Sequence, residues 1–308
     1  MNLGKYILLT CKGIAMGAAD VVPGVSGGTI AFISGIYDEL IHSLKSFNTG
    51  SLKLLFSLKF RSLWKEVNGT FLLAVFSGIL VSIFSLARLL KYLMETYPIF
   101  IWSFFFGLVL ASAIVILIKI NKWSPGNILA LIIGTVVMFV ISTFSPAETT
   151  EAYWFIFISG AIAVCAMILP GISGAFILLI LGKYQFILGA VSAFDLPVLV
   201  IFGSGVITGL ISFANLLSWL LGRYRDTTIS ALAGFLIGSL NKIWPWKENI
   251  SERISSDGHI VPLLQKNILP GEYLSVTGES SYILHASALI LIGIFLVLVL
   301  DRLAKKPS

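Results

Sequence analysis

The chain has 308 residues, of which 57% are hydrophobic and only 12% are charged, and its mean hydropathy is +0.97. Since a soluble domain carries roughly 25% charged residues, this composition excludes an ordinary soluble protein and indicates an integral membrane protein. The net charge of +6 comes mainly from basic residues in short segments between apolar runs, where they set membrane topology, so nucleic acid is not expected as a partner.

Several apolar runs approach the ~20 residues that a membrane-spanning helix needs, and alternating strand-like patterns are absent. We therefore predict an all-α polytopic membrane protein that uses the lipid bilayer as its surroundings. The two cysteines and three histidines show no metal-ligand spacing, so neither a metal nor another cofactor is expected.

The first predicted element is a hairpin over residues 5–44, in which a helix is interrupted and restarted. The interruption lies at residues 22–29 (VPGVSGGT), where proline ends one apolar segment and small residues precede the next. This N-terminal run also resembles a secretory signal peptide with small residues at 15–18 as its cleavage site. The interruption recurs at 169–176 (LPGISGAF), where it cannot be a targeting signal, so we favour a membrane hairpin.

Residues 45–66 contain five basic residues and one acid, and we predict an amphipathic interfacial segment there. Most of its apolar residues fall on one side at helical spacing, although Lys59 interrupts that side. The pattern is typical of a helix that lies on anionic lipid, and equally of an ordinary cytoplasmic loop helix.

Three membrane helices are predicted next, over residues 71–93, 98–118 and 128–144, and they complete a first unit of residues 1–150. A second unit, residues 151–308, is predicted to repeat this order. Its expected elements are a hairpin over 153–191, helices over 196–221, 228–243 and 283–300, and an outside loop over 247–281.

The two units are related in sequence. Residues 23–37 align without gaps to residues 170–184, with 8 of 15 positions identical. Residues 77–112 align to residues 204–239, with 11 of 36 positions identical. We therefore predict a duplicated protein, in which each half is a broken-helix (re-entrant) hairpin followed by three transmembrane helices.

The charges predict that the two halves are inverted relative to each other. A hairpin returns the chain to the side where it started, whereas three crossings move it to the other side. With both termini in the cytoplasm, most basic segments fall inside, as the positive-inside rule requires, and Arg88, Lys91 and Lys183 are the exceptions. Hairpins that span fully would satisfy the same charges. Inverted repeats with broken helices are typical of secondary transporters, whose substrates bind where the breaks meet.

The two breaks are the candidate substrate site. The first turn of each restarted helix has unpaired backbone N–H groups and the positive end of the helix dipole, a combination that binds phosphate or carboxylate. Close packing of helices is the alternative explanation for small residues, but repetition of the break favours a site. The candidate phosphate-binding residues are Pro23, Gly24, Ser26, Gly27, Gly28, Thr29, Pro170, Gly171, Ser173, Gly174 and Arg88.

Ionisable residues near the breaks are candidates for ion coupling. Asp20 precedes the first break and aligns with Met167, so only the first half places a carboxylate there. Asp38 and Glu39 are further coupling candidates, or else solvated residues at a cytoplasmic mouth. Arg88 is expected near the outer end of its helix, where it would attract a phosphate or anchor to lipid headgroups.

Residues 17–29 (GAADVVPGVSGGT), 169–174 (LPGISG) and 244–246 (WPW) together resemble a bacterial membrane family associated with polyprenyl-phosphate transport. The resemblance spans nearly the whole chain. It implies a flippase that returns undecaprenyl phosphate from the outer to the inner leaflet of the cytoplasmic membrane, for recycling of the lipid carrier of the cell envelope. It also implies that the two Pro-Gly motifs and Asp20 are functional. The coupling ion, a proton or Na⁺, and assembly into a homo-oligomer stay open.

Two other function classes stay open as well. A transporter or channel for a small inorganic anion would use the same paired helix N-termini. An intramembrane lipid phosphatase would need a histidine within the cavity, whereas His42, His259 and His285 are expected at a hairpin end, in the outside loop and at a helix start. The sequence therefore favours a transporter over an enzyme.

Overall fold

The computed structural model describes residues 3–22, 24–147, 149–254 and 260–304. In the first half the elements are α1 (Leu3–Val21), α2 (Gly27–Ile33), α3 (Tyr37–Lys45), α4 (Thr49–Phe56), α5 (Phe60–Glu66), α6 (Gly69–Thr96), α7 (Pro98–Ile118) and α8 (Pro125–Thr143). In the second half they are α9 (Tyr153–Ile168), α10 (Gly174–Ile180), α11 (Tyr184–Ser192), α12 (Leu196–Arg223), α13 (Arg225–Ser239), β1 (Lys247–Ile254), β2 (Ile260–Asn267), α14 (Tyr273–Thr277) and α15 (Ile283–Ala304).

Five of the described helices, namely α6, α7, α8, α12 and α15, are long and apolar enough to cross a membrane, and α10 and α11 form a pair bent by 107°. A mainly helical, multi-pass membrane protein is thereby confirmed. The helix predicted over 228–243 is α13, which ends early at Ser239. Its 15 residues extend for about 22 Å, less than the ~30 Å of a hydrocarbon core, so the chain continues in irregular structure.

Each predicted hairpin contains a helix that stops and restarts, first between α1 and α2 and again between α9 and α10. Gly24 and Gly171 are equivalent in the alignment, and they have φ angles of +88° and +86°, a left-handed conformation that favours glycine. Ser26 and Ser173 then adopt extended backbone and cap α2 and α10 with their side chains. The two breaks therefore share one local geometry, which the repeated sequence produces.

Glycine allows the long helices to cross closely. α1 packs along α6, and α9 packs along α12. In the first pair Gly78 lies against the carbonyl oxygen of Thr10, and in the second pair Gly205 lies against that of Phe157. Gly78 and Gly205 are equivalent in the alignment. A second type of crossing joins α7 to α15 and α8 to α13.

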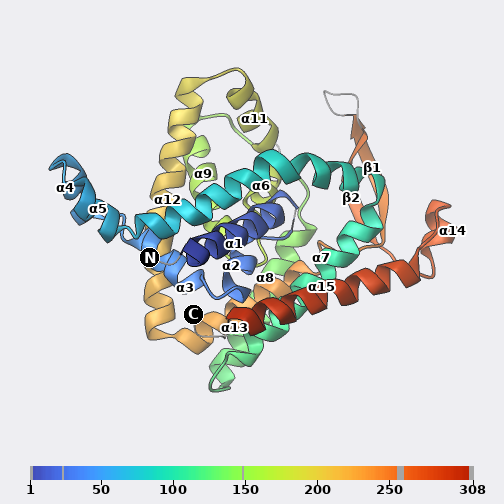
Figure 1. The fold of residues 1–308 in the computed structure, drawn as a ribbon. Helices are drawn as coiled ribbons and strands as arrows, with labels where there is room; N and C mark the ends of the chain where they lie inside the picture. The colour runs from blue at the N-terminus through green and yellow to red at the C-terminus, as the bar shows by residue number, and fades with distance from the viewer. Residues whose placement is uncertain (1–2, 23, 148, 255–259, 305–308) are drawn as a thin grey trace.

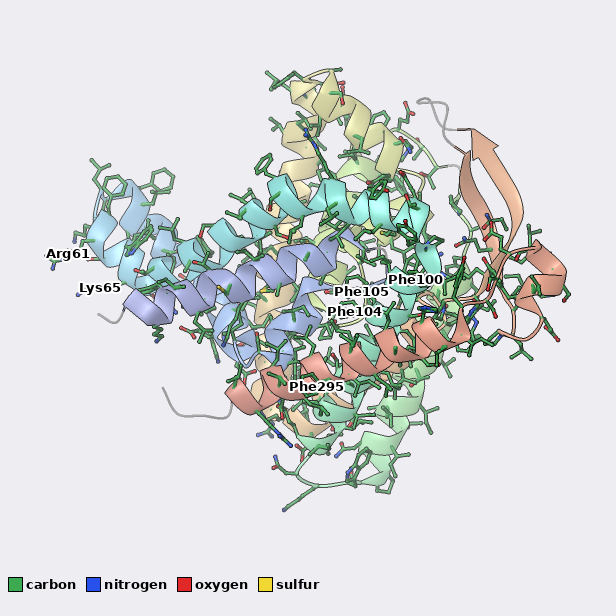
Figure 2. The ribbon with its side chains drawn as sticks, turned by 45° about the vertical axis from the view of Figure 1, so that its right-hand side comes forward. Arg61, Lys65, Phe100, Phe104, Phe105 and Phe295 are labelled. Atoms are coloured by element: carbon green, nitrogen blue, oxygen red, sulfur yellow. The ribbon has the colours of Figure 1, made fainter. Side chains whose placement is uncertain are left out.

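The main hydrophobic core surrounds α2, whose seven residues are all buried. Helices α1, α3, α6, α7, α12 and α13 contribute to this core. Phe105 of α7 is buried in it, whereas Phe295 of α15 is 68% exposed on the outer face of its helix (Figure 2). Much of the remaining surface is apolar, as expected where lipid replaces water.

The segment over residues 45–66 forms two short helices, α4 and α5, in place of one continuous helix. Leu58 takes a φ of +55° in the turn between them. Phe56 and Leu58 are 83% and 73% exposed, and Arg61 and Lys65 lie at the outer end of this arm (Figure 2). Exposed apolar and basic side chains therefore coexist on one projecting element.

The predicted outside loop over 247–281 has regular structure within its described residues. It contains the antiparallel pair β1–β2 and the short helix α14. These elements lie at the opposite end of the molecule from α4 and α5 (Figure 1). The β hairpin is the element of the described chain that an all-α prediction omits.

Candidate functional site

The two helix breaks lie against each other in the interior of the protein. The Ser26 hydroxyl donates a hydrogen bond of 2.9 Å to the carbonyl oxygen of Met167, just before the second break. The Gly171 N–H in turn donates to the Thr29 hydroxyl at 3.1 Å. The predicted site residues Ser26, Thr29 and Gly171 are therefore brought to one place, although Gly171 lies more than 140 positions from the other two in the sequence.

The contact between the breaks is tight. Gly28 faces the carbonyl oxygen of Ile168 so closely that a Cβ atom would overlap it. The buried Tyr37 hydroxyl donates to the same oxygen at 3.3 Å. A tyrosine ends the aligned segment in both halves, Tyr37 in the first and Tyr184 in the second, but the sequence did not indicate this contact of Tyr37.

At the first break, the N–H groups of α2 are paired within the protein. The Asp20 carboxylate accepts a 2.7 Å hydrogen bond from the Gly27 N–H, and the Ser26 hydroxyl accepts one of 3.0 Å from the Gly28 N–H. The Thr29 N–H donates to the Ser26 carbonyl oxygen at 2.9 Å. In this conformation the carboxyl group of Asp20 occupies the helix N-terminus, where the sequence predicted free N–H groups.

At the second break, the corresponding N–H groups are less completely paired. The Phe176 N–H donates to the Ser173 hydroxyl at 3.4 Å. The N–H groups of Gly174 and Ala175, which are partly exposed, have no hydrogen-bond partner among the described residues. A methionine aligns with the aspartate of the first half, so no equivalent carboxylate fills this helix end. The second break is thus the more available for an external anion.

A lysine that the sequence did not indicate lies between the two breaks. Lys242 follows α13, and its stem packs against Gly24, where a Cβ atom would come within 3.2 Å of the lysine Cγ. Its ammonium nitrogen lies 4.7 Å from the centre of the Phe176 ring on α10. A helix continuing to residue 243 would have placed this lysine in an ordinary last turn. The early end of α13 instead turns it toward the breaks.

Lys247 is a second partly buried lysine in the same region. Its ammonium group donates to the Lys242 carbonyl oxygen at 2.6 Å and lies 4.1 Å from the centre of the Trp102 ring. Burial, and secondly the positive charge of Lys242, lowers the pKa of Lys247 to about 7. Among the described residues, no carboxylate forms an ion pair with either lysine.

The other predicted ionisable residues lie apart from the breaks. Asp38 pairs with Arg225 at 3.1 Å, with both side chains about half exposed. Glu39 accepts a hydrogen bond of 2.9 Å from the Asn68 amide. Arg88 is exposed on α6 and forms no hydrogen bond or ion pair with a described residue. Of the three predicted coupling carboxylates, only Asp20 contacts the first break.

The remaining predicted residues have packing roles in this conformation. Pro170 and Gly171 are buried, and the backbone of Gly171 lies close to Leu236 of α13. Gly174 lies close to the Ala163 carbonyl oxygen of α9. Pro23 falls outside the described residues.

Comparison with known proteins tests the resemblance that the motifs suggested. A family model described as undecaprenyl phosphate translocase-like matches residues 16–261, which include both breaks. The chain belongs to this family. The resemblance to polyprenyl-phosphate transporters is thereby confirmed.

Two relatives of the chain are named polyprenyl-phosphate transporter. The protein from Vibrio cholerae is 49% identical over 302 residues, which are 98% of each chain. The protein from Staphylococcus aureus is 33% identical over 253 residues, which are 76% of this chain and 84% of its own. No solved structure shows a significant match to the chain.

The family match therefore includes Asp20, both breaks and Lys242. Together these residues bring hydroxyl groups, backbone N–H groups and an ammonium group to one interior region. Such groups bind anions, and phosphate oxygens accept hydrogen bonds from all of them. The described residues include no group of three or more metal-ligating side chains.

Proposed function

We propose that this protein moves a polyprenyl monophosphate, undecaprenyl phosphate, from the outer to the inner leaflet of the bacterial cytoplasmic membrane. The family description and the names of the two relatives support the substrate class. The observation that carries the proposal is the direct contact of the two breaks through Ser26 and Thr29. Irregular backbone at membrane depth must be buried in protein or line a polar cavity. Two breaks in direct contact are therefore suited to line a site for the headgroup.

In the proposed complex, the phosphate headgroup is bound at the second break while the polyprenyl tail stays in lipid. The unpaired N–H groups of Gly174 and Ala175 are the first donors. Ser173, which caps the same helix, adds a hydroxyl group. The apolar tail needs no protein cavity, because the lipid chains of the hydrocarbon core already solvate it.

Movement between leaflets would follow alternating access by two inverted halves, with both termini in the cytoplasm. The equivalent crossings α1–α6 and α9–α12 support the duplication, as do the crossings α7–α15 and α13–α8, which exchange partners between the halves. The breaks are joined by single hydrogen bonds at Ser26, Thr29 and Tyr37, which a rearrangement can exchange for bonds to phosphate.

Asp20 would couple this movement to an ion. While the carboxylate is charged, it occupies the N-terminus of α2 through the Gly27 N–H. Binding of a proton or Na⁺ would weaken that hold and allow α2 to move against the second break, where the phosphate is bound.

The proposal is tested by a leaflet-resolved assay of undecaprenyl phosphate transport in proteoliposomes. The wild-type protein should move the lipid. Ser26→Ala, which removes the hydrogen bond to Met167, should slow it, whereas Ser62→Ala on the exposed face of α5 should not. Absence of wild-type transport, or flux of chloride or inorganic phosphate in its place, would contradict the proposal. Release of phosphate from polyprenyl diphosphate would instead indicate an enzyme.

A further inference from the structure

Each half of the protein holds a lysine beside its restarted helix. Lys119 follows α7, and its ammonium nitrogen lies 5.1 Å from the centre of the Phe32 ring on α2. Lys242 follows α13 and lies 4.7 Å from the Phe176 ring on α10. α7 and α13 are equivalent helices in the alignment, but Phe32 lies in the last turn of α2 and Phe176 in the first turn of α10, so the two lysines contact opposite ends of the restarted helices.

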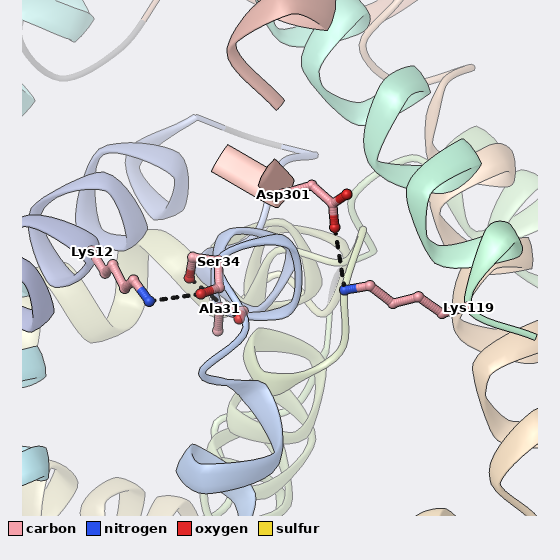
Figure 3. Close-up of polar contacts among 5 residues, drawn as sticks. All are labelled: Lys12, Ala31, Ser34, Lys119 and Asp301. Carbon is pink, nitrogen blue, oxygen red and sulfur yellow. Dashed lines mark hydrogen bonds and ion pairs between the residues drawn. The ribbon is translucent and has the colours of Figure 1, made fainter. Parts of the chain in front are cut away.

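The two lysines differ in their counter-ions. The Lys119 ammonium lies 3.9 Å from a carboxylate oxygen of Asp301 on α15 (Figure 3). Lys242 forms no ion pair within the described chain and has Lys247 as a second positive charge nearby. Removing unpaired like charges from water is unfavourable. An anion bound between the two ammonium groups would attract both of them and offset their mutual repulsion. Among the described residues, the protein therefore supplies no counter-ion for this pair of cations.

The segment that carries these lysines is fixed in position. The Asn241 amide donates to the Ser142 hydroxyl at 2.7 Å and accepts from the Asn267 amide at 2.9 Å. The Trp244 indole N–H donates to the Ile268 carbonyl oxygen at 2.9 Å. These bonds connect the irregular segment to α8 and to the end of β2. A site on such a support is preorganised, which reduces the ordering cost of binding.

We propose that Lys242 and Lys247 form the outer-leaflet receiving site for a phosphate monoester headgroup. The inference rests on the proposed function and on the outside location of residues 247–281. A phosphate monoester carries a charge of about −1.5 to −2 at neutral pH, enough to neutralise both ammonium groups. In the absence of the anion, cation–π contacts with Phe176 and Trp102 stabilise the ammonium groups of Lys242 and Lys247.

The first experiment measures equilibrium binding to the purified full-length protein. Farnesyl phosphate is the probe, with farnesol and inorganic phosphate as separate arms. Lys242→Gln and Lys247→Gln should each weaken binding of farnesyl phosphate about ten- to a hundredfold, since each loses a charge-assisted contact. Lys242→Arg should retain most of the affinity, which shows that a cation at this place suffices. Lys266→Gln, an equal charge change on the exposed face of β2, should bind like the wild type.

Each result decides the proposal. Wild-type affinity in both glutamine variants would overturn it, as would equal weakening by Lys266→Gln. Farnesol binding as tight as that of farnesyl phosphate would show that the tail alone is recognised and would also overturn it. Inorganic phosphate that binds as tightly as the lipid would assign the lysines to a free anion instead.

A second measurement does not depend on the variants. Because the pKa of Lys247 is lowered to about 7, its amine should react with an amine-directed label near neutral pH, where an ordinary lysine of pKa ~10.4 is almost fully protonated. Bound farnesyl phosphate should stabilise the charged form and slow labelling of Lys247 but not of Lys266. Unchanged labelling of Lys247 at saturating ligand would overturn the site.

The inference and the proposed function fail in different ways. If wild-type protein binds farnesyl phosphate through the lysines but does not move undecaprenyl phosphate in proteoliposomes, the transport proposal fails and the site stands. If transport occurs and both glutamine variants transport at the wild-type rate, the site fails and the function stands.

Discussion

Asp20 makes the two breaks chemically unequal. It places a carboxylate on the Gly27 N–H of α2, whereas α10 begins with open N–H groups and has a lysine over its first turn. One break therefore holds a carboxyl group of the protein, and the other lies beside a lysine that forms no ion pair with a described residue. In the proposed mechanism, the binding site for phosphate and the sensor for a coupling ion would thus be separated between two copies of one motif.

The substitution Asp20→Asn removes the charge of this side chain while keeping its size and shape. The asparagine keeps an oxygen that can accept from the Gly27 N–H, so the fold and the binding of farnesyl phosphate should persist. The variant has no charge for a proton or Na⁺ to neutralise, so an imposed gradient should no longer accelerate its transport. The transport rate under a gradient should fall about tenfold, or to the rate without a gradient, since a single charge-assisted bond contributes about 1.5–3 kcal/mol. Proteoliposomes with imposed gradients provide the measurement.

Asp38→Asn is the matched control for this prediction. Asp38 pairs with Arg225 where both side chains are about half exposed, and such pairs contribute only about 0–1 kcal/mol. Its gradient dependence should stay close to that of the wild type. An Asp20→Asn protein with wild-type gradient dependence would remove Asp20 from the coupling mechanism.

The residues of the breaks could be predicted because a repeated sequence reveals them without a structure. Ser26, Thr29 and Gly171 were selected in this way, and they do meet. Lys242 could not be selected, because its place depends on where α13 ends. Neither could the occupation of α2 by Asp20, since the sequence shows which N–H groups lack helical partners but not which side chain folds back onto them.

Among the helices and strands, the close crossings depend on glycine at the contact rather than on glycine in general. A Cβ atom on Gly205 of α12 would overlap the carbonyl oxygen of Phe157 on α9. Gly203, two residues earlier on the same helix, has no atom of a neighbouring element within 4 Å of such a Cβ atom. Replacing glycine by alanine at these two positions therefore tests the packing contact, because only the alanine at 205 would overlap a neighbouring helix.

Gly205→Ala should lower the thermal unfolding midpoint of the detergent-solubilised protein, because α9 and α12 must separate. The expected cost is about 1–3 kcal/mol, typical of an overpacked contact. Gly203→Ala should leave the midpoint unchanged or raise it slightly, since alanine favours a helix by about 0.5–1 kcal/mol over glycine. An equal decrease in both variants would show that the crossing does not depend on the contact at Gly205.

The prediction of elements succeeded where apolar runs have clear ends. The helix predicted over 98–118 is α7 with those same ends, because Pro98 occupies its first turn and a lysine follows its last. The division of residues 45–66 into two helices was not predictable, since the turn contains no glycine or proline and Leu58 takes the left-handed conformation instead. The strands β1 and β2 lie outside the apolar runs that guided the assignment.

At the scale of the whole molecule, the two halves are interleaved rather than separate. α7 of the first half packs along α15 of the second, and α13 of the second packs along α8 of the first. The breaks from both halves meet between these crossings. A rigid movement of one half against the other would therefore change the contact of the breaks directly, which is what alternating access requires.

Inversion of the halves can be tested by labelling single cysteines at corresponding places. Ser62 on α5 precedes α6, and Ser192 on α11 precedes the equivalent helix α12; both are exposed. After replacement of Cys11 and Cys165 by serine, Ser192→Cys should react with a membrane-impermeant thiol reagent in intact cells. Ser62→Cys should react only after the membrane is opened, because the basic segment around it is expected in the cytoplasm.

The reversed pattern would leave the halves inverted but turn the whole protein over, and the direction of transport would need a new assignment. Labelling of both cysteines from the same side would mean that α6 and α12 enter the membrane from one side. The halves would then be parallel, and the two breaks could not open to opposite leaflets. In that case the contact between Ser26 and Met167 would be a packing contact, and alternating access across it would be lost as a mechanism.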